Sequence, residues 1–200
     1  MTEGKMFIFT APSGAGKTTI VRHILEKYDF LDFSVSATTR AKRDYESEGR
    51  DYYFMDVEAF KEKIAANEFV EWEEVYKDQF YGTLHSELNR IWGLGKHLVF
   101  DIDVRGAVNI KSAFGDRCMS VFVKPPSFEI LKQRLKDRNT ETAESLARRI
   151  DKVRTELNFE NCFDIVLVND EIDIAFTEAE HIVETFIFGI PGYDRQNKNI

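Results

Sequence analysis

One loop near the N-terminus reads Ala11-Pro12-Ser13-Gly14-Ala15-Gly16-Lys17-Thr18. It follows a short apolar run, residues 6–9, and it opens onto residues with helical spacing, namely Ile20, Val21, Ile24 and Leu25. A phosphate-binding loop is expected in this context, in which a strand leads into a loop of small residues, then Gly-Lys-Thr, then a helix. Successive backbone N–H groups of such a loop can bind phosphate oxygens, and the helix N-terminus adds a partial positive charge.

Two side chains of this loop have their own chemistry. Lys17 can reach terminal phosphates as a point charge, and the Thr18 hydroxyl suits a Mg²⁺ ligand site. The usual pattern G-x-x-x-x-G-K-[ST] begins with glycine, whereas this chain has Ala11. The alternative is a glycine-rich turn before an ordinary helix, but the flanking segments favour a nucleotide site. The predicted nucleotide-binding residues are Ala11, Pro12, Ser13, Gly14, Ala15, Gly16, Lys17, Thr18 and Thr19.

Composition limits the remaining possibilities. The chain has 200 residues with 43% hydrophobic content, which suits a single globular domain with room for inserted lobes. The net charge of −8 argues against general nucleic-acid binding, so any phosphate site must be a local concentration of Arg and Lys. Cys118 and Cys162 fit no metal spacing, and we expect buried free thiols in a reducing compartment. Neither a signal peptide nor a membrane span is evident, so we expect a cytoplasmic protein.

Strands and helices alternate along the chain, which predicts an α/β fold with a parallel sheet flanked by helices. Apolar runs at 97–100, 118–123 and 165–168 are typical of buried parallel strands. Helical patterns occur at 18–27, 57–67, 86–94, 127–137, 142–158 and 172–188. Shorter strands are predicted at 33–36, 51–55 and 69–73, of which the first and last alternate as half-buried strands do. Their hydroxyl, aromatic and acidic residues predict an inserted lobe. Asp56 and Ser127 suit the N-caps of the helices that follow them. Asp101 and Asp103 follow a buried strand, at the sheet edge where α/β proteins bind ligands.

The inserted lobe contains residues suited to a phosphorylated purine. Arg40 and Arg43 are close enough in sequence to converge on one anion, and Tyr52 and Tyr81 could add phenolic hydrogen bonds. Glu71 could accept hydrogen bonds from two adjacent N–H groups, a pair that guanine offers and adenine lacks. The guanine O6 could accept a hydrogen bond from a hydroxyl such as that of Ser36 or Thr83. Each residue alone is a weak signal, because exposed charges are usually solvated.

Together these motifs resemble the guanylate kinase family. The matching segments are Ser36-Ala37-Thr38-Thr39-Arg40 with Arg43, Gly49-Arg50-Asp51-Tyr52, Glu71-Trp72, Tyr81-Gly82-Thr83 and Asp101-Ile102-Asp103. The resemblance covers nearly the whole chain. It implies a P-loop kinase fold within a single domain, 1–200, with a core (about 1–33, 85–124 and 160–200), a GMP-binding lobe built on a small mixed sheet (34–84) and a helical lid (125–159).

The resemblance also implies roles for individual residues. Ser36, Glu71 and Thr83 would bind guanine, while the GMP phosphate would be bound by Arg40, Arg43, Tyr52 and Tyr81. Asp101 and Asp103 would lie near the nucleoside and the hydrated metal. Asn169 would approach the adenine of ATP. The catalytic residues would be Lys17 together with Arg40, Arg43, Arg134, Arg138 and Arg149.

The implied reaction transfers the γ-phosphoryl group of ATP to GMP or dGMP, with Mg²⁺. Four departures from the family pattern stand at Ala11, Thr83, Arg105 and Asn139, of which Thr83 replaces a common serine and keeps the hydroxyl donor. One alternative is a scaffold module with the same fold and no chemistry, against which the intact Gly16-Lys17-Thr18 argues. Another is a related kinase with a different acceptor, such as a sugar phosphate, which would not need a guanine site. The sequence leaves the oligomeric state open, and it predicts neither a nucleic-acid nor a membrane partner.

Overall fold

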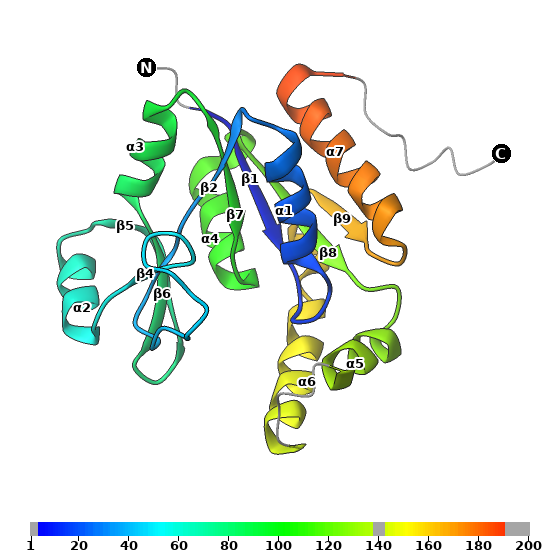
Figure 1. Ribbon diagram of the computed structural model, residues 1–200, viewed down its shortest axis with the longest axis horizontal. Coiled ribbons are helices and arrows are strands. Elements are labelled where there is room, and N and C mark those ends of the chain that lie inside the picture. Colours follow the sequence, from blue (N-terminus) through cyan, green and yellow to red (C-terminus); the bar gives the residue numbers. More distant parts are fainter. Residues whose placement is uncertain (1–3, 138–142, 191–200) are drawn as a thin grey trace.

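A parallel sheet forms the centre of the computed structural model, which describes residues 4–137 and 143–190 (Figure 1). Its strand order is β2-β7-β1-β8-β9, so β1 lies in the middle and pairs with β7 and β8. The strands are β1 (Met6–Thr10), β2 (Leu31–Phe33), β7 (His97–Asp101), β8 (Cys118–Lys124) and β9 (Ile165–Val168). Every residue of β1 is buried, as expected for a central strand that is covered on both faces.

Helices cover both faces of this sheet. Phe7 and Phe9 of β1 pack with α1 (Lys17–Lys27) and α7 (Ile172–Phe188). Met6 and Ile8 point to the other face, where α3 (His85–Gly93) and α4 (Val104–Phe114) complete a second apolar cluster. The alternation of side chains along one strand therefore supplies both halves of the core.

A second, smaller sheet lies beside the core and forms the lobe (Figure 1). Its order is β4-β3-β6-β5, and β3 pairs in parallel with β4 and antiparallel with β6. Phe60 of the lobe helix is fully buried, with its ring centroid 4.3 Å from that of Phe69 and 5.3 Å from that of Phe80. The elements are β3 (Ala37–Thr38), β4 (Tyr53–Phe54), α2 (Val57–Ala65), β5 (Phe69–Tyr76) and β6 (Gln79–Leu84).

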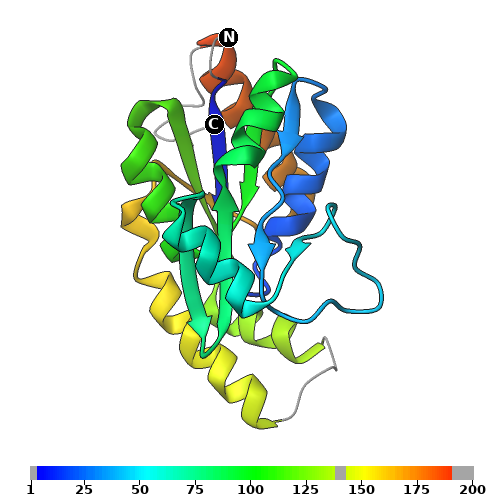
Figure 2. The same cartoon turned by 90° about the vertical axis from the view of Figure 1, so that its left-hand side faces the viewer.

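Two further helices extend from the carboxyl edge of the central sheet, and both views show them below it (Figures 1 and 2). These are α5 (Phe128–Asp137) and α6 (Ala143–Leu157), which contact each other. The Ser127 hydroxyl accepts a hydrogen bond from the Ile130 N–H at 3.2 Å, as predicted for the cap of α5. Short 3₁₀ helices, η1 (Gly115–Arg117) and η2 (Glu160–Cys162), precede β8 and β9.

The predicted α/β architecture with an inserted mixed sheet is confirmed, but one strand was predicted in the wrong place. We expected a strand over 33–36, whereas β2 ends at Phe33 and β3 begins at Ala37. The chain passes from one sheet to the other in between. The Ser34 N–H donates to the Val99 carbonyl of the core at 2.9 Å, and the Ser36 carbonyl accepts from the Tyr53 N–H of the lobe at 2.9 Å.

Helix α4 was not predicted, although its signals are present in the sequence. Asp103 caps it by accepting a hydrogen bond from the Gly106 N–H at 2.9 Å, and Val104, Ala107 and Ile110 form its buried stripe.

Cys118 is buried, as expected, but Cys162 is exposed because it ends the short η2 turn. Within the described ranges, no helix is long and apolar enough to cross a membrane. The boundaries of core, lobe and lid stay predictions.

Candidate functional site

A cavity of about 410 Å³ lies where the carboxyl ends of β1 and β7 meet the lobe. Its volume falls in the range of small-molecule sites. The whole predicted nucleotide-binding loop, residues 11–19, lines it. Other predicted site residues that line it come from the lobe and from the end of β7: Ser36, Tyr52, Glu71, Tyr81, Asp101 and Asp103. The fold therefore brings most of the predicted site into one place.

The predicted nucleotide-binding loop has a backbone conformation that requires glycine. Gly16 has φ +92°, and a Cβ there would lie 2.2 Å from the Asn169 amide nitrogen. That nitrogen donates a hydrogen bond to the Ala15 carbonyl at 2.8 Å, and Asn169 is buried. Asn169 thus holds the loop from the end of β9, so its predicted contact with adenine stays a prediction.

Three polar groups meet where the loop faces the end of β7. The Lys17 ammonium forms an ion pair with the Asp101 carboxylate and donates to the Ile102 carbonyl at 3.0 Å. The Thr18 hydroxyl donates to the other Asp101 oxygen at 2.8 Å. Parallel pairing of Phe9 with Asp101 fixes this proximity.

This hydroxyl and carboxylate pair suits Mg²⁺, which usually takes one or two protein oxygens and completes its shell with water and substrate phosphates. No cluster of His, Cys, Asp or Glu among the described residues could hold a metal by itself. The donors present therefore fit a metal ion that arrives with a nucleotide. Asp103 differs from Asp101, because its carboxylate caps α4.

Glu71 is a nearly buried carboxylate on the lobe side of the cavity. It is 9% exposed, and one of its oxygens accepts a hydrogen bond from the Thr83 hydroxyl at 2.8 Å. A Cβ on Gly106 would lie 2.9 Å from the other oxygen, so only glycine leaves room for it. Burial raises the pKa of Glu71 to about 7, with further contributions from Asp103 and Glu73, while the Thr83 hydroxyl opposes the rise. Such a group gains most from a ligand that donates hydrogen bonds.

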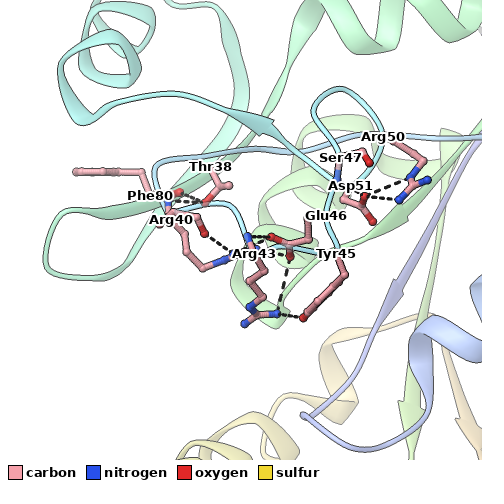
Figure 3. Close-up of polar contacts among 10 residues, drawn as sticks. Thr38, Arg40, Arg43, Tyr45, Glu46, Ser47, Arg50, Asp51 and Phe80 are labelled. Atoms are coloured by element: carbon pink, nitrogen blue, oxygen red, sulfur yellow. Dashed lines mark hydrogen bonds and ion pairs between the residues drawn. The ribbon is translucent and has the colours of Figure 1, made fainter.

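The two lobe arginines converge, but on a carboxylate of the protein (Figure 3). Arg40 donates to both oxygens of Glu46, at 2.7 and 3.0 Å, and Glu46 also accepts from the Arg43 N–H at 2.8 Å. The Arg40 guanidinium lowers the pKa of Glu46. The Glu46 side chain is only 5% exposed, so this ion pair is largely buried and holds the Arg40 guanidinium in one orientation. Neither arginine is among the residues that line the cavity.

The two predicted phosphate-binding tyrosines, Tyr52 and Tyr81, line the cavity, and Tyr52 also contacts Arg40. Their rings are 6.0 Å apart between centroids, and the Arg40 guanidinium lies 5.3 Å from the centre of the Tyr52 ring. Burial raises the pKa of Tyr52, so its hydroxyl keeps its proton and can donate it to an acceptor.

Other predicted residues lie apart from the cavity lining. Thr83 is fully buried, and its hydroxyl is directed to Glu71. Arg134 of α5 donates to the Asn169 carbonyl at 3.3 Å, and Arg149 is half-buried on α6. Arg138 lies outside the described residues. Neither Arg134 nor Arg149 lines the cavity, and the catalytic roles of the three lid arginines stay predictions.

Sequence reasoning missed two acidic residues. Glu46 follows Arg40 and Arg43 at a regular spacing of three, and this spacing was a usable signal. Glu156 of α6 lines the cavity, and burial raises the pKa of its carboxyl. Its position on α6 gave no signal in the sequence, because the tertiary fold brings that helix to the cavity.

Comparison with known proteins identifies relatives over most of the chain. The family model described as guanylate kinase matches residues 3–186. A guanylate kinase from Porphyromonas gingivalis is 44% identical over 184 residues, which cover 92% of this chain and 98% of the relative. One from Salinibacter ruber is 46% identical over 187 residues, which cover 94% of this chain and 99% of the relative.

A solved structure gives the same result in three dimensions. The crystal structure of guanylate kinase from Anaplasma phagocytophilum superposes with a TM-score of 0.71 at 28% identity. The match covers 92% of this chain and 84% of that one. The likeness therefore includes the central sheet, the lobe and the helices around the cavity.

The raised pKa of Glu71 predicts a pH dependence of stability. In the unfolded chain Glu71 ionises near 4.5, whereas in the folded protein it stays protonated up to about pH 7. The folded state then binds more protons between these values, so stability should fall as pH rises from 4.5 to 7, by about 3 kcal/mol in total. Chemical unfolding of Glu71→Gln should lack this decline. Glu58→Gln, which removes an exposed carboxylate from the lobe, controls for charge, and identical slopes in all three proteins would refute the assignment.

Proposed function

The chain belongs to the guanylate kinase family, and we propose that its cavity binds ATP through residues 11–19 and GMP through the lobe. It is a nucleoside monophosphate kinase, which transfers the γ-phosphoryl group of ATP to the phosphate of GMP and releases ADP and GDP. We extend the acceptors to dGMP, because none of the proposed contacts involves the ribose 2′-hydroxyl. The cytoplasm, predicted from the sequence, is the proposed compartment.

The observation that supports GMP most directly is the position of Glu71. This nearly buried carboxylate shares one cavity with the phosphate-binding loop. The Watson–Crick edge of guanine carries N1–H and N2–H groups side by side, and an ionised Glu71 can accept from both. We propose that Ser36 donates to the guanine O6, and that Thr83 acts on the base through Glu71, to which its hydroxyl is bound.

Phosphoryl transfer needs positioning and neutralisation of charge more than covalent chemistry. We propose that Lys17 leaves Asp101 to bind the terminal phosphates of ATP, and that Arg40 and Arg43 hold the GMP phosphate with Tyr52 and Tyr81. The acceptor phosphate is already an anionic nucleophile, so no general base is required. Arg134, Arg138 and Arg149 would supply further positive charge from the lid.

A Mg²⁺ ion would be held by the Thr18 hydroxyl and, through water, by Asp101, whose carboxylate accepts from that hydroxyl at 2.8 Å. When bound, it supplies positive charge that the phosphate oxygens share in the transition state. The side chains around it orient the phosphates, and Glu46 keeps Arg40 directed along the lobe. Exclusion of water by the lobe and lid would prevent hydrolysis of ATP.

The alternatives fit the site less well. A scaffold module would not need a glycine at the positive φ of Gly16, the ion pair of Lys17 with Asp101, or the hydrogen bond that Asn169 makes to the loop. A kinase with a sugar phosphate acceptor would not need a carboxylate buried opposite the loop. The charge on Glu71 costs free energy that a sugar hydroxyl would repay less fully than two guanine N–H groups.

The acceptor specificity can be tested by ADP formation from ATP and Mg²⁺ with GMP, AMP, CMP or UMP. We expect kcat/KM for GMP to exceed that of the other nucleotides by about 100-fold or more, because a site built for hydrogen bonds rejects bases that leave its polar groups unpaired. Equal turnover with AMP, or no turnover with any of the four by the folded protein, would refute this function.

The role of Arg40 can be tested against a neighbour in the same loop. Arg40→Ala removes the guanidinium that Glu46 orients, and we expect kcat/KM for GMP to fall on the order of 100-fold. Lys42→Ala removes an exposed positive charge two residues away and should stay within about twofold of the wild type. The assignment is wrong if both variants lose activity equally, since the effect would then be one of overall charge.

A further inference from the structure

A buried carboxylate lies between the two sheets and is not part of the cavity. Glu87, in the first turn of α3, is 2% exposed. One oxygen accepts from the Val35 N–H at 2.9 Å and from Arg90 Nη2 at 2.8 Å. The other accepts from the Tyr53 hydroxyl and from Arg90 Nε, both at 3.0 Å. A buried carboxylate with this many donors is well compensated for the loss of water.

Two of these donors belong to the junction between core and lobe. Val35 lies in the connection from β2 to β3, where the preceding residue is bonded to the core and the following one to the lobe. Its own N–H goes to Glu87 instead of to a neighbouring strand. Tyr53 belongs to β4 of the lobe. Glu87 therefore binds both the backbone of this connection and the lobe, from a helix that packs on the core.

The remaining partner extends this connection to the core sheet. Arg90 Nη1 donates to the Asp32 carboxylate at 3.1 Å, and Nη2 donates to the Phe33 carbonyl at 3.2 Å. Both acceptors lie in β2, the last core strand before the lobe. Arg90 thus binds the end of β2, and Glu87 binds the connection through which the chain leaves the core.

Each lobe contact of Glu87 is adjacent to a residue that lines the cavity. Val35 precedes Ser36, and Tyr53 follows Tyr52. The phosphate-binding loop has no such connection to Glu87 in the described contacts, because it is held from β7 and β9. A change at Glu87 should therefore move the acceptor side of the cavity and leave the ATP side in place.

We propose that Glu87 is a positioning residue that sets the GMP-binding lobe on the core through Val35 and Tyr53, and so determines the affinity for the acceptor nucleotide. This inference rests on the proposed function, because it assigns the lobe to GMP. Glu87 does not touch substrate in this account. It acts through the placement of Ser36 and Tyr52.

The test is steady-state kinetics with each substrate varied, together with calorimetric binding of GMP in the absence of ATP. Glu87→Gln keeps the size of the side chain but places an NH₂ group against the donors of Arg90 or Tyr53. We expect KM for GMP to rise about tenfold and KM for ATP to stay within about twofold. Amide exchange at Val35 should also become faster.

Two variants separate positioning from general stability. Tyr53→Phe removes only the lobe contact of Glu87 and should raise KM for GMP about threefold, with the KM for ATP unchanged. Asp32→Asn removes the negative charge that pairs with Arg90 on the core side of the same network and should leave both constants within about twofold. If Glu87→Gln does not fold, Tyr53→Phe alone decides the question.

The proposal would be overturned if Glu87→Gln raised the KM values for GMP and for ATP equally. It would also be overturned if Asp32→Asn had the same effect as Tyr53→Phe, since the network would then act through stability alone. The wild-type protein serves as the reference for the proposed function. Wild-type turnover that does not depend on GMP would refute both the proposed function and the inference about Glu87. Normal wild-type turnover with unchanged GMP kinetics in Glu87→Gln would refute only the inference.

Discussion

Parallel pairing of β1 with β7 is the constraint on which the site depends. It sets Phe9 opposite Asp101, so that the loop after one strand and the carboxylate at the end of the other share one edge of the sheet. Lys17 and Thr18 then reach Asp101, while Asn169 at the end of β9 holds the loop from behind. The predicted phosphate-binding side is thus positioned by three strands of the core. The lobe with Glu71 has its own small apolar cluster and reaches the core through the connection at 34–36 and through α3.

The charges of this acidic protein are distributed to suit such a site. The net charge is −8, yet the cations near the cavity are paired with particular carboxylates: Lys17 with Asp101, and Arg40 with Glu46. These pairs keep the basic groups oriented at modest cost, and phosphates can replace or join the carboxylates. Glu71 is the opposite case. Burial raises the pKa of its carboxyl, although the Thr83 hydroxyl that donates to it opposes the rise. We propose that a base with N–H groups supplies the further hydrogen bonds.

Sequence reasoning predicted the parts whose chemistry is local. The small residues before Lys17, the carboxylates after a buried strand and the cap at Asp56 all have short-range causes, and the structure contains them. The alternation around Glu71 was also visible, but it did not reveal that Glu71 is buried while Trp72 is 42% exposed. We predicted a strand at 33–36 because its side chains alternate. In the structure the Val35 N–H donates instead to Glu87 of α3, which is distant in sequence. Contacts of this kind depend on the tertiary fold and have no local signal.

The most direct test of the account is calorimetric binding of GMP and of inosine monophosphate, which lacks the 2-amino group, to the wild-type protein and to Glu71→Gln. If Glu71 accepts from the paired guanine N–H groups, the wild type should prefer GMP by about ten- to hundredfold, and the variant should lose most of that preference. Equal affinity of the wild type for both nucleotides, or an unchanged preference in Glu71→Gln, would contradict the assignment of the lobe to guanine.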